Sequence, residues 1–516
     1  MKLKVINTIV LVLLVMCSLS AVRAQQGPGP DFDKYINDAL KEWQVPGLAI
    51  AIIKDDRGVF AKGYGTRELD KSLPVDEHTL FAIGSSSKAF TAASIGMLVD
   101  EGKLKWEDPA TKYLPGFQLF DPYATRELMV SDLLSHRSGL TRGDLLWYAS
   151  PYDRDEVLRR IRYLKPTWSM RAHFGYQNIM FLAAGKIVSN VGNKSWDDFI
   201  RERIFVPLGM KSSSTSIKAF ANSDNVASPH AKLDDKVQVV AWRNIDNIAP
   251  AGSINSNVLD MAQWVRLQLG GGVYEGKRLL SAAALKEIQT PQTIIRLEGP
   301  MASLYPEAHF LTYGFGWFLS DYRGRKVVEH GGAIDGMRAQ VAMLPEEKLG
   351  LVVLSNLNGS ILPHALMFKI FDTYLGGAQR DWSSDLLKTT KGLEEQETAA
   401  EKKAEAERVK GTAPSLPLEK YSGRYQSEMY GEAKFSLENG KLVAQFGPNF
   451  SGDLEHWNYD TFRVTWRDRM EGKGLVNFRL NAQGKVESVN IDRLSDFTRV
   501  PDEKPAVPAT TSSAKP

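Results

Sequence analysis

Residues 89–99 form an apolar segment that constrains the fold more than any other part of the chain. The segment is apolar on nearly every side of a helix, and such a helix must be covered by other elements all around. Lys88, at its start, is the only charged residue between His78 and Asp100. Lysine is rarely buried without a partner or a function, and burial lowers the pKa of its amine. The sequence therefore predicts a buried helix that begins with a lysine.

Ser85 lies three residues before Lys88, so the two side chains share one helix face about a turn apart. A hydroxyl beside a perturbed amine at a helix N-terminus is the arrangement of an activated nucleophile. The spacing alone is weak evidence, because the tail contains a second Ser-x-x-Lys, from Ser512 to Lys515. In the alternative interpretation Ser85 only caps the helix, and Lys88 extends past a short apolar face to water. The helix context by itself does not decide between them.

Length and charge limit the possible classes of protein. A chain of 516 residues is too long for one ordinary domain, so we expect two or more. The net charge is +3, from 64 basic and 61 acidic residues, and there is no concentrated basic stripe. Nucleic-acid binding usually leaves such a stripe. We expect a small-molecule or peptide substrate and no nucleic-acid partner, while the oligomeric state is unknown.

The first 24 residues have the organisation of a secretory signal peptide. Two lysines precede an apolar run over residues 5–16, and a small-residue cleavage site ends at Ala24. The run is too short to span a membrane, and no transmembrane span is expected after cleavage. We expect a periplasmic or secreted protein without cysteine, which excludes disulfides and thiol catalysis. In the alternative, a lipoprotein, the single cysteine, Cys17, is acylated and retained.

Composition predicts the domain organisation of the rest of the chain. A helix at 32–43, strands at 47–54 and 59–64 and four late strands favour an α+β fold, with a sheet built from both ends of the segment. An Ala/Glu/Lys-rich stretch predicts a solvated helix or a semi-rigid linker. Short alternating segments after it predict a small antiparallel sheet or barrel with an aromatic core. The late strands are expected at 313–319, 326–329, 338–344 and 351–355. The expected boundaries are 1–24 for the signal peptide, 25–380 for the α+β domain, 381–415 for the charged helical linker, 416–500 for the small β-barrel-like domain and 501–516 for a disordered tail.

Two further motifs follow Ser85-Ser-Ser-Lys88 along the chain: Tyr176-Gln-Asn178 and His330-Gly-Gly332. With these motifs, in this order, the chain resembles the serine β-lactamase and penicillin-binding protein superfamily. The resemblance covers residues 32–375. It is closest to the branch of AmpC-type β-lactamases, D-alanyl-D-alanine carboxypeptidases, D-aminopeptidases and related esterases. It implies an antiparallel sheet flanked by a helical subdomain.

The resemblance implies catalytic roles for the matched residues. Ser85 would attack a carbonyl carbon and become acylated. Lys88 and Tyr176 would move the protons, and either could be the formal base, since nearby cations could hold the Tyr176 phenol partly ionised. The backbone amides of Ser85 and Ala333 would form the oxyanion hole.

The implied substrate-binding residues are Asn178, His330 and Gly332. Asn178 would hydrogen-bond the substrate or help to orient Lys88. His330 stands where the family often has lysine, and Gly331 lacks a hydroxyl that would bind a substrate carboxylate. An unperturbed histidine has a pKa of about 6.5, so carboxylate recognition would weaken as the pH rises. This departure favours peptidase or esterase activity over efficient β-lactam hydrolysis.

We expect no cofactor and no metal, because the histidines lack metal-ligand spacing and no phosphate-binding loop is present. For His136 the resemblance implies a mainly architectural role beside the site. The expected function is an extracytoplasmic serine hydrolase that forms an acyl-enzyme with a β-lactam, a D-amino-acid peptide or a small ester. One alternative is a penicillin-binding-type sensor that acylates without turnover. Another is a non-catalytic scaffold whose function lies in the C-terminal domain.

Overall fold

Helix α3 (Lys88–Asp100) lies at the centre of the larger domain, and its residues from Lys88 to Leu98 are all buried. The predicted buried helix is therefore present. The structure is a computed structural model that describes residues 27–376, 380–492 and 494–501. The predicted signal peptide, with Cys17, and all but the first residue of the predicted tail lie outside the described residues.

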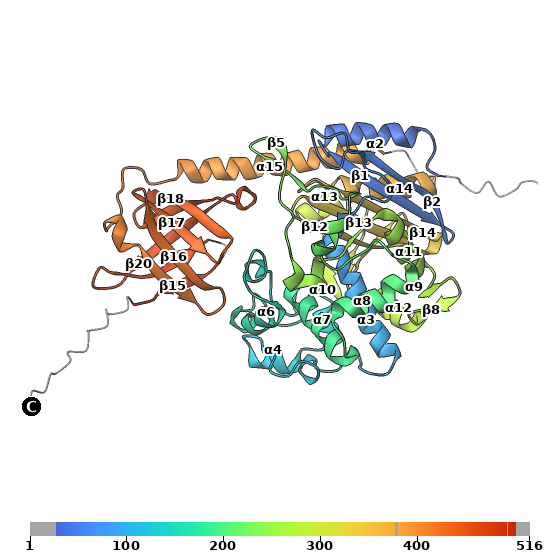
Figure 1. Ribbon diagram of the computed structural model, residues 1–516, viewed down its shortest axis with the longest axis horizontal. Coiled ribbons are helices and arrows are strands. Elements are labelled where there is room, and N and C mark those ends of the chain that lie inside the picture. The colour runs from blue at the N-terminus through green and yellow to red at the C-terminus, as the bar shows by residue number, and fades with distance from the viewer. Residues whose placement is uncertain (1–26, 377–379, 493, 502–516) are drawn as a thin grey trace, which may run out of the picture.

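An eight-stranded antiparallel sheet backs α3 (Figure 1). The sheet is built from both ends of the segment, as predicted, because β1 and β14 are neighbours: Leu48 lies opposite Ser355 and Lys54 opposite Leu349. The strands, in spatial order, are β2 (Arg57–Gly65), β1 (Gly47–Lys54), β14 (Leu349–Ser355), β13 (Met337–Leu344), β12 (Arg325–Ile334), β11 (Phe318–Tyr322), β10 (Leu311–Tyr313) and β9 (Thr293–Ile295).

Helices cover both faces of the sheet. Side chains alternate between the faces along a strand, so Ala51 packs in the core that contains α3, and Ile50 packs in the core on the opposite face. This double cover explains why β1 and β14 are continuous apolar runs. The helices on the α3 side include α7 (Asn178–Gly192) and α11 (Val258–Leu269), and those on the other side include α2 (Asp31–Glu42) and α14 (Leu362–Leu375).

The predicted single strand at 313–319 is wrong. The structure has β10 and β11 there, separated by a turn in which Gly314 N donates to the Trp317 carbonyl oxygen at 2.9 Å. Gly316 has a φ of +72°, and a Cβ on it would come within 2.8 Å of the Lys88 carbonyl oxygen. The turn packs against the first residue of α3, a contact that apolar alternation does not indicate.

The outer edge of β12 is only partly paired. β11 pairs with β12 from Arg325 to Glu329, whereas β12 continues to Ile334. Within the described ranges, no strand pairs with this edge at 330–334. An unpaired edge presents free backbone N–H and C=O groups. The free edge lies beside η1 (Gly84–Ser87), the 3-10 helix that leads into α3.

Helix α15 (Trp382–Ala406) runs from the larger domain to the C-terminal barrel (Figure 1). At its start Trp382 is buried and stacks on Phe368, with ring centroids 4.5 Å apart. Its later turns are largely exposed, as expected for a solvated helix. Near its end Glu405 Oε2 lies 2.7 Å from Nη1 of Arg463 in the barrel. The helix is therefore attached at both ends.

The C-terminal strands form a closed eight-stranded antiparallel barrel. Its aromatic residues from Tyr421 to Phe497 form the core as predicted, except Trp457 and Tyr459, of which Tyr459 is 58% exposed. Trp457 is partly exposed, and the guanidinium groups of Arg408 and Arg463 each lie 4.8 Å from its ring. The strands are β15 (Gly423–Ser427), β16 (Gly431–Glu438), β17 (Lys441–Phe446), β18 (Phe450–Asn458), β19 (Thr461–Trp466), β20 (Lys473–Leu480), β21 (Val486–Ile491) and β22 (Asp496–Arg499).

The barrel contacts the larger domain through polar side chains. Tyr152 OH donates to the Tyr430 carbonyl oxygen at 3.0 Å, and Asn449 Nδ2 donates to the Ala149 carbonyl oxygen at the same distance. The barrel is therefore docked on the loop around residue 150 as well as tethered by α15.

Candidate active site

Ser85 is the serine of its triplet that faces the cleft. It lies in η1 and is partly exposed. Ser86 and Ser87 are buried: Ser86 Oγ donates to the His330 carbonyl oxygen at 2.9 Å, and Ser87 Oγ accepts from Ile254 N at 3.1 Å. These two hydrogen bonds hold η1 in place, so that Ser85 Oγ faces the cleft.

Lys88 places a buried amine beside this hydroxyl. Its Nζ lies 3.0 Å from Ser85 Oγ and donates to the Ala251 carbonyl oxygen at 2.8 Å. The side chain is fully buried, and the loss of water contacts lowers the pKa of the amine well below its usual value. A neutral amine has a lone pair that can accept the Ser85 proton.

Tyr176 contacts the same oxygen from the other side. Its OH donates to Ser85 Oγ at 2.8 Å. The Lys88 Nζ and the Arg142 guanidinium lie 4.9 and 5.0 Å from its ring centroid. The expectation that such cations hold the phenol partly ionised is wrong, because burial outweighs them and raises the pKa of Tyr176. Tyr176 is therefore a neutral hydroxyl.

His136 holds the backbone around Tyr176. Its Nδ1 accepts from Gln177 N at 3.0 Å, and its carbonyl oxygen accepts from Gly175 N at 2.8 Å. The imidazole also packs against the Tyr176 ring, with centroids 4.1 Å apart. Burial lowers the pKa of His136, so the ring is neutral. These contacts fit the predicted architectural role.

Asn178 contacts an aspartate that sequence reasoning missed. Its Nδ2 donates to Asp144 Oδ1 at 2.8 Å, and no hydrogen bond joins it to Lys88. Trp147 Nε1 donates to the same Asp144 oxygen at 2.9 Å. Asp144 lines the cleft as the first residue of the 3-10 helix η3 (Asp144–Leu146), yet an isolated aspartate gives no spacing signal by which it could have been found.

Glycines bring the backbone of β12 against η1. A Cβ on Gly332 would lie 1.8 Å from the Ile83 carbonyl oxygen, and a Cβ on Gly84 would lie 2.5 Å from the backbone nitrogen of Ala333. Only residues without a Cβ permit this approach. The Ala333 amide is thereby close to the segment that carries Ser85. The oxyanion-hole role of these two amides stays a prediction.

His330 is buried and neutral, which contradicts the expectation that it titrates near its ordinary pKa. Its Nδ1 lies 2.6 Å from the Gly331 carbonyl oxygen, and its Nε2 lies 2.9 Å from Tyr313 OH. A carbonyl can only accept, so Nδ1 carries the proton and Nε2 accepts from Tyr313. Burial lowers the pKa of His330 to about 3. Neither ring nitrogen is left for a substrate carboxylate.

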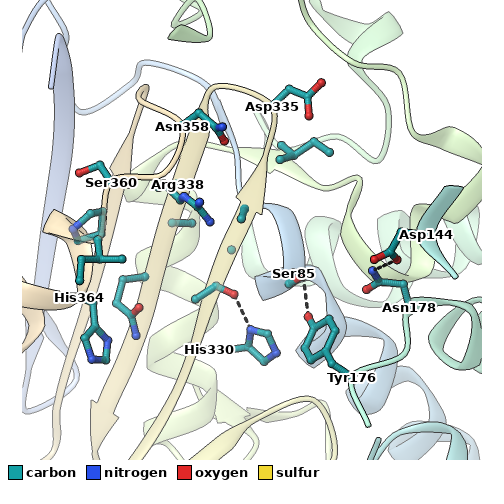
Figure 2. A pocket seen from close by; sticks show the side chains of 18 of the residues that line it. Ser85, Asp144, Tyr176, Asn178, His330, Asp335, Arg338, Asn358, Ser360 and His364 are labelled. Carbon is teal, nitrogen blue, oxygen red and sulfur yellow. Dashed lines mark hydrogen bonds between the residues drawn. The ribbon is translucent and has the colours of Figure 1, made fainter. Parts of the chain in front are cut away.

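The cleft has a volume of about 600 Å³ and extends around the free edge of β12. Residues from both faces of the sheet line it, and the barrel contributes part of its wall through Met470 and Glu471. Figure 2 shows the residues on the two sides of Ser85: Tyr176, Asn178 and Asp144 on one side, and Arg338, Asn358, Ser360 and His364 on the other.

Within the described residues, no three His, Cys, Asp or Glu side chains are grouped so that they could hold a metal ion. None of the helices in the described ranges is both long enough and apolar enough to cross a membrane.

The fold and the site define a protein of the β-lactamase and penicillin-binding protein superfamily, extended by a C-terminal barrel. The chain belongs to the β-lactamase family, whose model matches residues 32–369. Residues 407–504 match a domain of unknown function, DUF3471. Family membership, together with relatives named as hydrolases, identifies the chain as a hydrolase.

Two fungal proteins are similar over most of the chain. The unguisins hydrolase ungD' of Aspergillus campestris is 30% identical over 422 residues, which cover 78% of this chain and 76% of that protein. The unguisins hydrolase ungD of Aspergillus violaceofuscus is 29% identical over 477 residues, which cover 84% of this chain and 82% of that protein. Among solved structures, the octameric penicillin-binding protein homologue from Pyrococcus abyssi has a TM-score of 0.60 at 22% identity, covering 90% of this chain and 99% of that one. This last likeness supports the fold.

Proposed function

We propose that the chain is an extracytoplasmic serine hydrolase that forms an acyl-enzyme on Ser85. One observation carries the proposal: Ser85 Oγ lies within hydrogen-bond distance of both the Lys88 amine and the Tyr176 hydroxyl, at 3.0 and 2.8 Å. A hydroxyl beside a base of lowered pKa is an activated nucleophile. The directions of the two pKa shifts favour Lys88 as the base.

In the acylation step, Ser85 Oγ bonds to the substrate carbonyl carbon and its proton passes to neutral Lys88. The amides of Ser85 and Ala333 stabilise the oxyanion. As the C–N or C–O bond to the leaving group breaks, Tyr176 donates a proton to that group, and the proton held by Lys88 replaces it. Water then attacks the acyl-enzyme by the reverse transfers, which releases the acid and restores Ser85.

The proposed substrate is a β-lactam, a D-amino-acid peptide or a small ester, and the peptide and ester classes fit at least as well as the β-lactam. The absence of a positively charged side chain at position 330 supports this ranking. Because two relatives are named as unguisins hydrolases, unguisins belong in the substrate panel. The panel further contains nitrocefin, D-Ala-D-Ala peptides, D-aminoacyl amides and p-nitrophenyl esters.

Time-resolved labelling tests the acyl-enzyme. The full chain is incubated with a fluorescent penicillin or a fluorophosphonate, and its intact mass is followed. Ser85→Ala is compared with Ser512→Ala, which removes the serine of the other Ser-x-x-Lys. A transient penicillin adduct on Ser85 indicates turnover, and a persistent one indicates a sensor. If neither reagent labels Ser85, the mechanism is wrong.

Cell fractionation tests the location. The protein is expressed from its full gene, and the N-terminal residue of the mature form is sequenced. We expect Gln25 as the first residue, in the periplasmic or secreted fraction. An uncleaved cytoplasmic protein would refute the location without affecting the chemistry.

A further inference from the structure

Arg338 brings an unpaired cation to the part of the cleft behind β12. Among the residues that the structure describes, it makes no ion pair and no side-chain hydrogen bond, and its Nε is enclosed without a partner. Enclosing a charged group without a partner destabilises a fold. An arginine in this state indicates a ligand that supplies the missing negative charge and hydrogen-bond acceptors.

The sheet register shows how the cleft reaches Arg338. Arg338 lies opposite Ala333, and Gln340 lies opposite Gly331, so these side chains share one face of the sheet. That face points away from η1, because the neighbouring Gly332 faces η1. The cavity passes around the free edge of β12, where Gly331 has no side chain to close the passage. A Cβ on Gly331 would lie 3.2 Å from Gln340 Oε1.

A second free donor lines the same part of the cavity. The Asn358 side-chain amide makes no hydrogen bond to any described residue, and it follows β14, the strand beside Arg338. Figure 2 shows Arg338 and Asn358 on the opposite side of Ser85 from Asn178 and Asp144. The rear of the cleft is therefore rich in unused donors.

Three titratable groups that line the same cavity are neutral or already paired, so they do not strongly repel an anion. Both oxygens of Glu329 accept hydrogen bonds, from Tyr305 and Gln340, and burial raises the pKa of Glu329 to about 7, which reduces its charge. Asp335 is paired with Arg243 at 2.9 Å. The pKa of His364 is lowered by burial to about 4, so its ring is neutral.

We propose that Arg338 binds a carboxylate of the substrate and thereby replaces the lysine and hydroxyl that His330 and Gly331 do not provide. The inference rests on the proposed function, since the carboxylate belongs to the molecule whose carbonyl carbon reaches Ser85. A guanidinium binds a carboxylate through two parallel N–H···O bonds, and the Asn358 amide supplies another donor. The substrate class is then an acyl donor, whether peptide, lactam or ester, that carries a free carboxylate.

A matched pair of substrates tests this assignment. One is an N-acyl-D-alanyl ester of 3-hydroxybenzoate, which has a free carboxylate, and the other is the same ester of 3-hydroxybenzamide. Arg338→Gln should lower kcat/KM for the carboxylate ester about tenfold to hundredfold, the range typical of a lost charged hydrogen bond. The same variant should change kcat/KM for the amide ester by less than about twofold. Arg338→Lys should restore part of the kcat/KM that Arg338→Gln loses for the carboxylate ester.

The controls separate a failure of this assignment from a failure of the proposed function. If both esters lose activity equally in Arg338→Gln, the carboxylate site is wrong while the serine mechanism stands. If wild type reacts with neither ester nor a fluorophosphonate, the proposed function itself fails. If only the fluorophosphonate reacts, 3-carboxyphenylboronic acid and its carboxamide analogue are compared as competitors of labelling. Arg338→Gln should then weaken inhibition by the carboxylate compound about tenfold to hundredfold and leave inhibition by the carboxamide compound unchanged. The melting temperature of Arg338→Gln should not fall, since an unpaired charge is removed, and a large fall would refute the absence of a structural partner.

Discussion

Arg243 joins the larger domain to the barrel, because its Nη2 lies 2.6 Å from Asp468 Oδ2. Its Nε lies 2.9 Å from Oδ2 of Asp335, which follows Ala333 by two residues. On the barrel side, Met470 follows Asp468 by two residues and lines the cleft. One guanidinium therefore connects the end of β12 to the cleft wall that the barrel provides.

Replacing Arg243 should disturb that wall. Arg243→Ala leaves two carboxylates without their shared partner, and we expect kcat/KM to fall about tenfold for substrates that fill the cleft. Labelling by a small fluorophosphonate should change less than about twofold. Arg479→Ala, which removes an exposed barrel arginine paired with Asp496, is the control. Equal effects of the two variants on substrate turnover would contradict a role of Arg243 in holding the cleft wall that the barrel provides.

The lowered pKa of Lys88 should appear in the pH profile of acylation. The protonated amine cannot accept the Ser85 proton, so the labelling rate should rise with pH and reach its plateau well below the ordinary lysine pKa of about 10.4. Lys88→Arg should lower the rate by about a hundredfold or more, because a guanidinium is not a base at these pH values. Lys186→Arg, on the surface of α7, should leave it unchanged. A profile that still rises at pH 10 would argue against Lys88 as the base.

His330 should have no titration in the working range. Its folded-state pKa of about 3 keeps the ring neutral, so KM for a carboxylate substrate should have the same pH dependence from pH 5.5 to 8.5 in His330→Gln as in wild type. Stability follows the sign of the shift: the unfolded ring binds a proton below about 6.5 and the folded ring does not, so stability is lost as the pH falls. His330→Gln should lessen this loss between pH 6.5 and 4 in thermal melts. A change of KM with an apparent pKa near 6.5 that is present in wild type and lost in His330→Gln would restore the carboxylate role of His330.

Glu329 should impose the opposite dependence. Its folded-state pKa is about 7 against an ordinary value of 4.5, so the folded carboxyl keeps a proton that the unfolded one has lost. The contribution of this proton to the free energy of unfolding is fully present below pH 4.5. It declines as the pH rises to about 7, by about 3 kcal/mol at most. Glu329→Gln should therefore gain stability relative to wild type between pH 5 and 8. Glu397→Gln, on the exposed part of α15, is the control for urea unfolding, and parallel curves for the two variants would refute the prediction.

Adjacent glycines offer a matched steric test. Gly332→Ala places a Cβ 1.8 Å from a backbone oxygen and should reduce fluorophosphonate labelling by about a hundredfold or more, because η1 must move. In Gly331→Ala the new Cβ lies 3.2 Å from the flexible end of the Gln340 side chain and at an ordinary contact distance of 3.6 Å from the Ala339 carbonyl oxygen, so labelling should persist. Labelling of both variants at the wild-type rate would show that the separation of β12 and η1 is not critical.

Local patterns in the sequence were sufficient to predict much of the fold. The continuous apolar run at 47–54 corresponds to β1, and the apolar run after Lys88 corresponds to α3. Ser85, Lys88 and Tyr176 meet at one oxygen, as expected from motifs whose spacing is recognisable along the chain. Each of these features depends on residues close in sequence or on a known motif.

The remaining features depend on tertiary contacts. The neutrality of His330 follows from its burial and from Tyr313, and the barrel wall depends on Met470, which is 140 positions away from His330. Arg338 looks like an ordinary strand residue in the sequence. Its significance comes from the absence of partners around it, which only the packed structure reveals.

Helix α15 makes the shape of the cleft sensitive to chain length. A helix turns about 100° and advances about 1.5 Å with each residue, so deleting one residue from its exposed turns would rotate the barrel relative to the larger domain. Removing seven residues would nearly restore the angle but shorten the helix by about 10 Å. The length and the twist of α15 therefore together set where Met470 lies relative to the cleft.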